Sequence, residues 1–134
     1  MGRKYLDELN IKDEYPWEWN KDDSRQEYWK QEREEYGFDE RHTWSLDYTM
    51  DLLLYERLCM YKEYVTGFID LTFPEFTLKD EELNLAQCLD RMIEGLRLDL
   101  TLDDYDEKRK EEPTAKLISE VYEIYALCHK ALWW

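Results

Sequence analysis

The chain has 134 residues and a formal net charge of −15 at pH 7, and 16% of its residues are aromatic. A chain of this length suits one domain that can bury a core without disulfides or metals. The negative charge, which is spread along the chain, disfavours direct binding to nucleic acid or anionic membrane, because both depend on Lys and Arg neutralising phosphate. We expect instead a protein partner with a basic surface, towards which charge would steer the encounter.

Neither a membrane span nor a secretory signal is expected, because no apolar run approaches the roughly 18 residues of a transmembrane helix. The three cysteines, Cys59, Cys88 and Cys128, are an odd number on apolar helical faces. This usage favours reduced thiols in a cytosol.

Residues 1–21 show no sustained period and contain the stretch YPWEWN. We expect an aromatic-rich N-terminal arm here, followed by a single helical domain over residues 22–134. Trp17 and Trp19 lie on the same side of the arm if it is extended. The arm either docks on the core through its aromatic residues or reaches a partner or a second subunit.

Four helices are expected, near residues 22–36, 43–65, 78–100 and 114–133. The acidic and capping residues at 22–24 start the first helix, and Gly37 ends it. Thr43 is expected to cap the central helix, which is apolar enough to be surrounded on most sides. Its predicted stripe consists of Met50, Leu54, Leu58, Tyr61 and Val65.

The segment 68–77 contains Pro74 and predicts a hydrophobic crossover loop in preference to a short strand. Gly95 in the third helix marks the close approach of a neighbouring backbone, since glycine costs about 1 kcal/mol relative to alanine there. The stripe of this helix is Leu85, Leu89, Met92, Leu96 and Leu100. The fold class expected from these patterns is all-α, a small antiparallel bundle of three to four helices.

The sequence offers no recognisable catalytic motif. Its 4 glycines are too far apart for a phosphate-binding loop. Glu32 and Glu35 have the spacing of half a helical magnesium site, but Asp47 and Asp51 on the central helix do not complete it. Glu-x-x-His, which helical di-metal sites use, is absent from the sequence. We therefore expect no enzyme, no metal and no cofactor.

The stretch FDERHTW, residues 38–44, allows two interpretations. In the first, its charges start the central helix and Trp44 fills the core. In the second, Arg41, His42 and Trp44, with Arg57 further along the helix, form an anion or nucleotide pocket at a helix N-terminus.

The chain ends in ALWW, and burying each of the two tryptophans is worth about 2 kcal/mol or more. They either close the core or lie in an interface, where tryptophan is a common anchor. We expect one aromatic patch that faces a partner. Its predicted members are Trp17, Trp19, Trp29, Trp133 and Trp134.

Residues 37–100 contain an acidic-basic pair, the run T-W-S-L-D, a distal Arg-Leu pair and a later Met-Ile pair. The pattern covers Asp39, Glu40, Thr43, Trp44, Ser45, Leu46, Asp47, Arg57, Leu58, Met92 and Ile93. In these motifs the stretch resembles a group of small uncharacterised proteins encoded by phages and prophages of gut and Gram-positive bacteria. The resemblance implies no activity, but it implies a phage gene that acts in the cytoplasm of a bacterial host cell.

The leading hypothesis is a non-enzymatic counter-defence protein of the anti-CRISPR or a related type. It would cover a basic surface of a bacterial defence or host protein. The main alternative is a homo-oligomeric sponge that sequesters a signalling nucleotide around Arg41, His42 and Trp44. A phage assembly or replication accessory protein is a further alternative.

Overall fold

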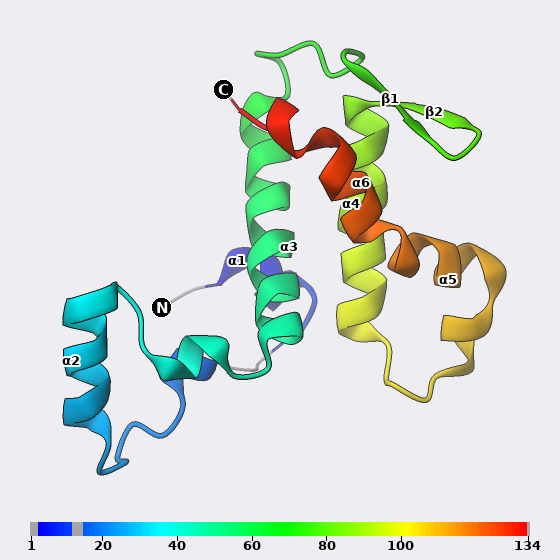
Figure 1. Cartoon of the computed structure of the whole chain (residues 1–134). Helices are drawn as coiled ribbons and strands as arrows, with labels where there is room; N and C mark the ends of the chain where they lie inside the picture. Colours follow the sequence, from blue (N-terminus) through cyan, green and yellow to red (C-terminus); the bar gives the residue numbers. More distant parts are fainter. Residues whose placement is uncertain (1–2, 12–14, 134) are drawn as a thin grey trace.

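The computed structural model describes residues 3–11 and 15–133, and Figure 1 shows how they are arranged. This part of the chain contains six α-helices: α1 (Lys4–Glu8), α2 (Gln26–Tyr36), α3 (Leu46–Val65), α4 (Leu85–Thr101), α5 (Glu112–Ser119) and α6 (Val121–Cys128). One antiparallel hairpin pairs β1 (Glu75–Leu78) with β2 (Glu81–Asn84). Short 3-10 helices are η1 (Pro16–Glu18), η2 (Glu40–Thr43), η3 (Glu107–Lys110) and η4 (His129–Ala131). The mostly helical character is confirmed, but the hairpin means that the fold is not purely all-α.

The long helices α3 and α4 form the centre of the bundle and run antiparallel beside each other (Figure 1). The helices α5 and α6 then return along α4, and α6 also packs against β1. The helix α2 lies apart from this bundle, next to η1 and η2 (Figure 1). The protein therefore consists of a helical bundle with the hairpin at one end and a smaller lobe near the other. We call this part, made of η1, α2 and η2, the N-terminal lobe.

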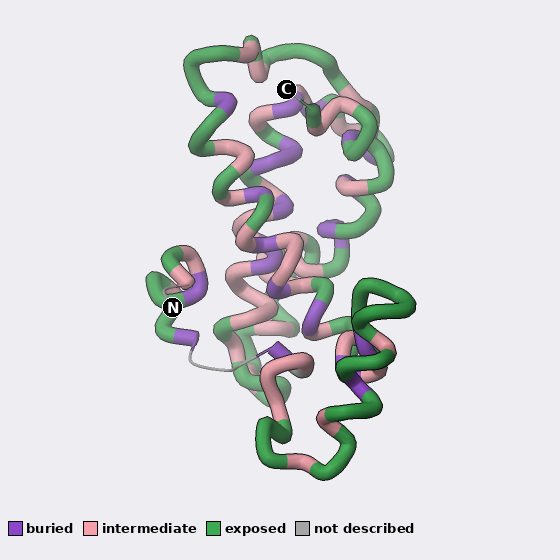
Figure 2. The backbone as a smooth tube through the Cα atoms, turned by 90° about the vertical axis from the view of Figure 1, so that its left-hand side faces the viewer, coloured by how far each residue is buried: buried purple, intermediate pink, exposed green. Residues whose placement is uncertain are grey.

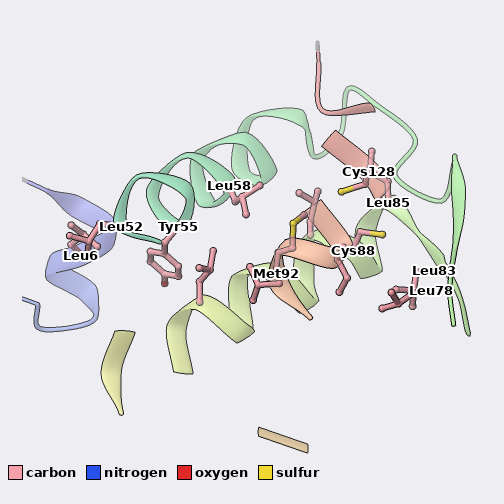
Figure 3. Close-up of a cluster of buried hydrophobic side chains, with 14 of the residues drawn as sticks. Leu6, Leu52, Tyr55, Leu58, Leu78, Leu83, Leu85, Cys88, Met92 and Cys128 are labelled. Atoms are coloured by element: carbon pink, nitrogen blue, oxygen red, sulfur yellow. The ribbon is translucent and has the colours of Figure 1, made fainter. Parts of the chain in front are cut away.

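The core lies between α3, α4 and α6 and extends to the hairpin, as Figure 3 shows. Four members of the predicted α4 stripe, Leu85, Leu89, Met92 and Leu96, are at most 1% exposed. Each such side chain contributes about 1.5–3 kcal/mol through the surface that it removes from water. The predicted stripe of α4 is confirmed for these four residues. The fifth, Leu100, is only partly buried.

The predicted face of α3 was wrong in part. Met50, which was placed in the stripe, is 45% exposed, whereas Leu52, which was placed outside it, is fully buried. Figure 2 shows buried and exposed residues alternating along the helices. Because α3 is apolar on nearly every side, its sequence alone gave no direction for the core. The buried residues of α3 are Thr49, Leu52, Tyr55, Leu58 and Val65.

The start of the central helix differs from the prediction by three residues. The chain first forms η2, and Ser45 then takes a left-handed conformation with φ of +44°, so α3 begins at Leu46. Thr43 does not cap α3, because its hydroxyl donates a hydrogen bond of 2.6 Å to the carbonyl oxygen of Glu40. The end of α2 agrees with the prediction, since Gly37 has φ of +87° just after Tyr36. Its start was wrong by four residues: α2 begins at Gln26, because the Asp23 side chain bonds to Arg25 and residues 22–24 do not cap the helix.

The third helix begins seven residues later than expected. Residues 78–84 belong to the hairpin, in which Phe76 pairs with Leu83. The hairpin also includes residues 75–77, so the prediction of a loop over 68–77 was wrong at its end. Asn84 is the true N-cap of α4: its side chain accepts a hydrogen bond from the Gln87 backbone, and the Gln87 side chain accepts one from the Asn84 backbone. This reciprocal pair satisfies two otherwise unpaired N–H groups.

The last predicted helix, 114–133, is broken into α5, α6 and η4. The break falls at Glu120, whose side chain is only 2% exposed and accepts a 3.0 Å bond from Lys79 in the hairpin turn. Gly95 lies beneath this junction, and a Cβ atom there would be 2.3 Å from the Leu117 carbonyl oxygen. The predicted close approach at Gly95 is confirmed, and it brings α5 directly onto α4.

The N-terminal arm is docked on the chain. Residues 4–8 form α1, which packs on α3 and buries Leu6 completely. The Tyr5 hydroxyl donates a 2.5 Å hydrogen bond to Glu63 near the end of α3. Trp17, in η1, packs against the core cluster as a partly buried residue. These contacts favour the docked interpretation of the arm.

Candidate functional site

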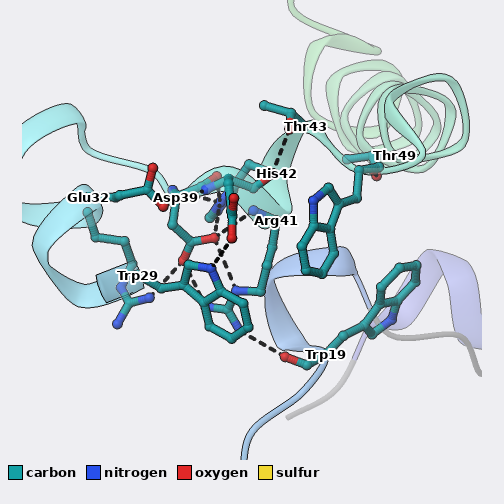
Figure 4. A network of polar contacts seen from close by, with 11 residues as sticks. Trp19, Trp29, Glu32, Asp39, Arg41, His42, Thr43 and Thr49 are labelled. Carbon is teal, nitrogen blue, oxygen red and sulfur yellow. Dashed lines mark hydrogen bonds and ion pairs between the residues drawn. The ribbon is translucent and has the colours of Figure 1, made fainter. Parts of the chain in front are cut away.

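The N-terminal lobe is organised around a buried carboxylate, Asp39, which is 1% exposed (Figure 4). Arg41 donates to it from Nε at 3.1 Å and from Nη2 at 2.8 Å, and Arg33 donates at 2.7 Å. Burial opposes ionisation of Asp39, but the hydrogen bonds from Arg41 and Arg33 outweigh it and hold the pKa of this carboxyl well below its usual range. We refer to Asp39, Arg41 and Arg33 as the Asp39 node.

Tryptophans surround this node and fix its position. The Arg41 guanidinium lies 4.3 Å from the centre of the Trp29 ring, and the Trp29 indole N–H donates a 2.7 Å bond to Glu40. Trp44 meets Trp29 edge to face at 6.0 Å. Because Trp29 is fully buried in these contacts, it holds the lobe together and presents no surface to a partner.

A pocket of about 430 Å³ opens beside the node. The Trp17 ring stacks between Tyr15, at 4.3 Å, and His42, at 4.6 Å. The pocket is lined by Trp17, Glu18, Lys21, Gln26, Arg33, Arg41 and His42. The lining has three cations, Lys21, Arg33 and Arg41, and one carboxylate, Glu18. Because Asp39 pairs with both arginines, the pocket and its node together carry one excess positive charge.

The structure therefore brings together only part of the predicted nucleotide pocket. Arg41 and His42 both line it. Trp44 instead packs against Trp29, and Arg57 lies on α3, where its guanidinium donates to the Leu53 carbonyl oxygen at 3.2 Å. The additional lining cations, Lys21 and Arg33, were not singled out from the sequence.

At the opposite end of the bundle, beside the hairpin, an apolar groove of about 670 Å³ opens to the surface. The segment 68–76, the start of α4 and the end of α6 with η4 form its walls. The lining residues are Phe68, Ile69, Phe73, Pro74, Phe76, Leu85, Leu127, Lys130, Ala131 and Trp133. Lys130 is the one charged side chain in this set, and we call this feature the apolar groove.

Three aromatic side chains of the groove are largely in water. Phe68 is 82% exposed, Phe73 is 65% exposed and Trp133 is 73% exposed. Burying such a side chain stabilises a protein or a complex by about 1.5–3 kcal/mol, so their joint exposure is costly. Contiguous exposed apolar surface of this kind marks an interaction site.

The backbone around these aromatic residues is held in place. The Leu71 carbonyl oxygen accepts a 2.9 Å bond from Ala86 at the start of α4. The Trp133 carbonyl oxygen accepts a 3.1 Å bond from the Tyr61 hydroxyl on α3. The groove is thus built on a fixed frame that presents its aromatic side chains to solvent.

The predicted tryptophan patch does not form as one surface. Trp17, Trp19 and Trp29 lie in the N-terminal lobe, before the start of α3, whereas Trp133 contacts Tyr61 near the other end of this helix. At a rise of about 1.5 Å per residue, Tyr61 lies about 22 Å along α3 from Leu46. Trp133 is therefore the member of the set that the structure places in an exposed site, and Trp134 lies outside the described residues.

A third hollow, of about 380 Å³, is acidic. Asp51 on α3 accepts a 2.5 Å bond from the Tyr122 hydroxyl on α6, and Asp99 on α4 lies close to it. Burial raises the pKa of Asp51 to about 6, the Tyr122 bond opposes this, and Asp99 and Asp47 raise it further. Within residues 3–11 and 15–133, no group of three or more His, Cys, Asp or Glu side chains is suited to hold a metal ion.

The sequence carries a signal for the groove in the run FIDLTFPEF. It places Phe68 and Phe73 in the loop before Pro74, where few neighbours can cover them, and Phe76 follows in β1. An apolar loop of this kind is either covered by other parts of the chain or exposed as a binding surface. Leu127 and Trp133 complete the groove from a part of the chain more than 50 residues away, as their numbers show.

No protein-family model, curated protein or solved structure matches this chain. None of the described helices combines the length and the apolar character that crossing a membrane requires. The function has to be inferred from the surface of the molecule itself.

Proposed function

We propose that this protein is a non-enzymatic, phage-encoded binding protein that inhibits a bacterial defence or host protein by protein–protein contact in the host cytoplasm. The observation that carries this proposal is the apolar groove, with Phe68, Phe73 and Trp133 exposed around it. Aromatic residues in a desolvated pocket supply most of the binding energy of protein interfaces.

The charge of the chain supports the same class of partner. A net charge of −15 attracts a basic protein surface and speeds its association. The charges act at long range and the groove acts at contact, so the two features support different stages of one binding event. The resemblance of residues 37–100 to phage proteins supports only the setting of this proposal, a phage gene that acts in a bacterial cytoplasm, where a defence protein such as a CRISPR nuclease is an available target.

The proposal is tested by expressing the protein in bacteria that carry an active defence system and measuring phage plating. The wild-type chain is expected to restore plating, and the double variant Phe68→Ser with Phe73→Ser is expected to restore much less. Losing about 2 kcal/mol at an interface weakens binding about 30-fold. Tyr105→Ser is the matched control, because Tyr105 is 96% exposed but does not line the groove.

Two outcomes would contradict the proposal. One is that the wild-type chain restores plating against none of a panel of defence systems that includes CRISPR nucleases. The other is that the groove variant and the Tyr105→Ser variant restore plating as well as the wild-type chain, which would place the contact elsewhere.

The pocket beside the Asp39 node favours a second candidate function, the sequestration of a signalling nucleotide. Lys21, Arg33 and Arg41 surround it, and phosphate groups bind to such clusters. Calorimetric titration with cyclic dinucleotides would test this. Arg33→Gln is expected to weaken binding, while Lys108→Gln, an exposed change outside the pocket, leaves it unchanged. Absence of binding to the wild-type chain, or a monomer in sedimentation, would count against the sponge.

A further inference from the structure

The apolar groove has a chemistry that restricts what can fill it. Its lining offers almost no hydrogen-bonding side chains, since nine of the ten lining residues are apolar and the tenth is Lys130. A partner segment with unpaired backbone N–H and C=O groups would lose its hydrogen bonds to water on entering such a surface. A helix satisfies these groups internally and presents only side chains, so it suits this groove better than an extended strand.

The charges around the groove indicate the flanks of that helix. The segments that build its walls, residues 66–76 and 121–133, carry three exposed carboxylates, Asp70, Glu75 and Glu123, against the single Lys130. Glu123 lies one helical turn before Leu127, which lines the groove. A second copy of this chain would bring net charges of −15 together, whereas a basic segment would be attracted.

We propose that the apolar groove binds an amphipathic helix of the partner protein, with apolar side chains against Phe68, Phe73 and Trp133 and with flanking Lys or Arg residues. This inference rests on the proposed function in taking a protein as the partner. It adds the secondary structure, the polarity and the charge of the segment that the partner contributes. The apolar residues of that helix recur at the i, i+3, i+4 and i+7 spacing of a single face.

Three synthetic peptides, each about four helical turns long, provide the test. One has leucine on one face and lysine on the other, and the second has glutamate in place of every lysine. A scrambled leucine–lysine peptide of the same composition lacks an apolar face. Each carries a fluorescent label, and binding is measured by anisotropy against the full-length protein.

The amphipathic leucine–lysine peptide is expected to bind the wild-type chain and the Tyr105→Ser control equally. The double variant Phe68→Ser with Phe73→Ser is expected to bind it about 10- to 100-fold more weakly, as for the loss of one or two interface anchors. The glutamate peptide and the scrambled peptide are expected to bind at least about 10-fold more weakly than the first. Circular dichroism checks that the variants are folded.

Three results would overturn the inference. Equal binding of the lysine peptide to wild type and groove variant would show adhesion to the acidic surface in general. Equal binding of the scrambled peptide would remove the need for a helix. Self-association of the wild-type chain in sedimentation, lost in the groove variant, would identify a second copy as the occupant.

The test separates this inference from the proposed function. If the lysine peptide binds in the groove while phage plating does not change, the inference stands and the counter-defence function fails. If plating depends on the groove but the peptide does not bind, the function stands and the helical, basic occupant is wrong.

Discussion

Asp51 provides the most direct test of the electrostatics of this fold. Its carboxylate joins three helices, because it lies on α3, accepts a bond from Tyr122 on α6 and faces Asp99 on α4. Burial raises its pKa from the ordinary value of 3.8 to about 6. The folded chain therefore holds the Asp51 proton more tightly than the unfolded chain does.

The sign and size of the effect follow from this difference. Below about pH 4 both states bind the proton, and Asp51 does not oppose folding. As the pH rises towards about 6, the unfolded chain releases its proton more readily, so stability falls, and above that pH the loss is complete. A shift of about two pH units corresponds to about 3 kcal/mol, which partial solvent exposure reduces to about 1–2 kcal/mol.

We predict that Asp51→Asn stabilises the protein at about pH 7.5 by about 1–2 kcal/mol and has little effect at about pH 4. The asparagine oxygen can still accept the Tyr122 hydrogen bond. The free energy of unfolding is measured by urea titration with circular dichroism at both pH values. Asp22→Asn, an exposed change of the same charge, controls for the general relief of negative charge. An Asp51→Asn effect that is the same at both pH values would refute the reasoning.

Three further predictions concern packing and the groove. Gly95→Ala should lower the free energy of unfolding, measured by urea titration, by about 1–3 kcal/mol, because the alanine Cβ would be 2.3 Å from the Leu117 carbonyl oxygen. An unchanged free energy would mean that α4 and α5 separate easily. Glu120→Gln should cost about 1–3 kcal/mol in the same assay, and Lys79→Gln should cost at least as much, because it leaves the buried Glu120 carboxylate without this partner. Phe68→Ser should change the free energy of unfolding by about 0.5 kcal/mol at most, as for a surface residue, and should therefore shift the thermal midpoint little. A large drop of the midpoint would show that Phe68 supports the core.

Some features of this fold could be predicted from short stretches of sequence. Gly37 ends α2 and Gly67 follows the end of α3, both with positive φ, which glycine adopts without steric cost. The leucine stripe of α4 identified its buried face, because polar residues occupy the opposite face. Gly95 indicated a close helix contact, because glycine otherwise weakens a helix.

Other features depended on contacts between distant residues. Five of the seven residues of the stretch 78–84 are Leu, Lys or Glu, which favour helices, yet the stretch lies in the hairpin with Leu78 and Leu83 in the core. At the break between α5 and α6, the buried Glu120 accepts a bond from Lys79, which is 41 residues away in the sequence. Propensity is a weak guide where such contacts decide the outcome.

The candidate sites divide in the same way. Arg41 and His42 were placed at a pocket from their position near a helix start, and both line it. The role of Trp29 was not visible, because the same residue type serves buried packing and interface anchoring. The groove joins the loop 68–76 to Trp133, and a sequence pattern cannot show that two such distant segments meet.

The positions of Trp29 and Trp133 give the molecule two internal optical probes. An indole that is fully shielded from water fluoresces at shorter wavelength than one that is 73% exposed. One lies in the N-terminal lobe and the other lies beside the hairpin. Because the chain has six tryptophans, the emission that is lost in Trp133→Phe, and not the red edge alone, reports events at the groove. A single label-free unfolding experiment, repeated with Trp133→Phe, would therefore reveal whether the lobe and the bundle melt together.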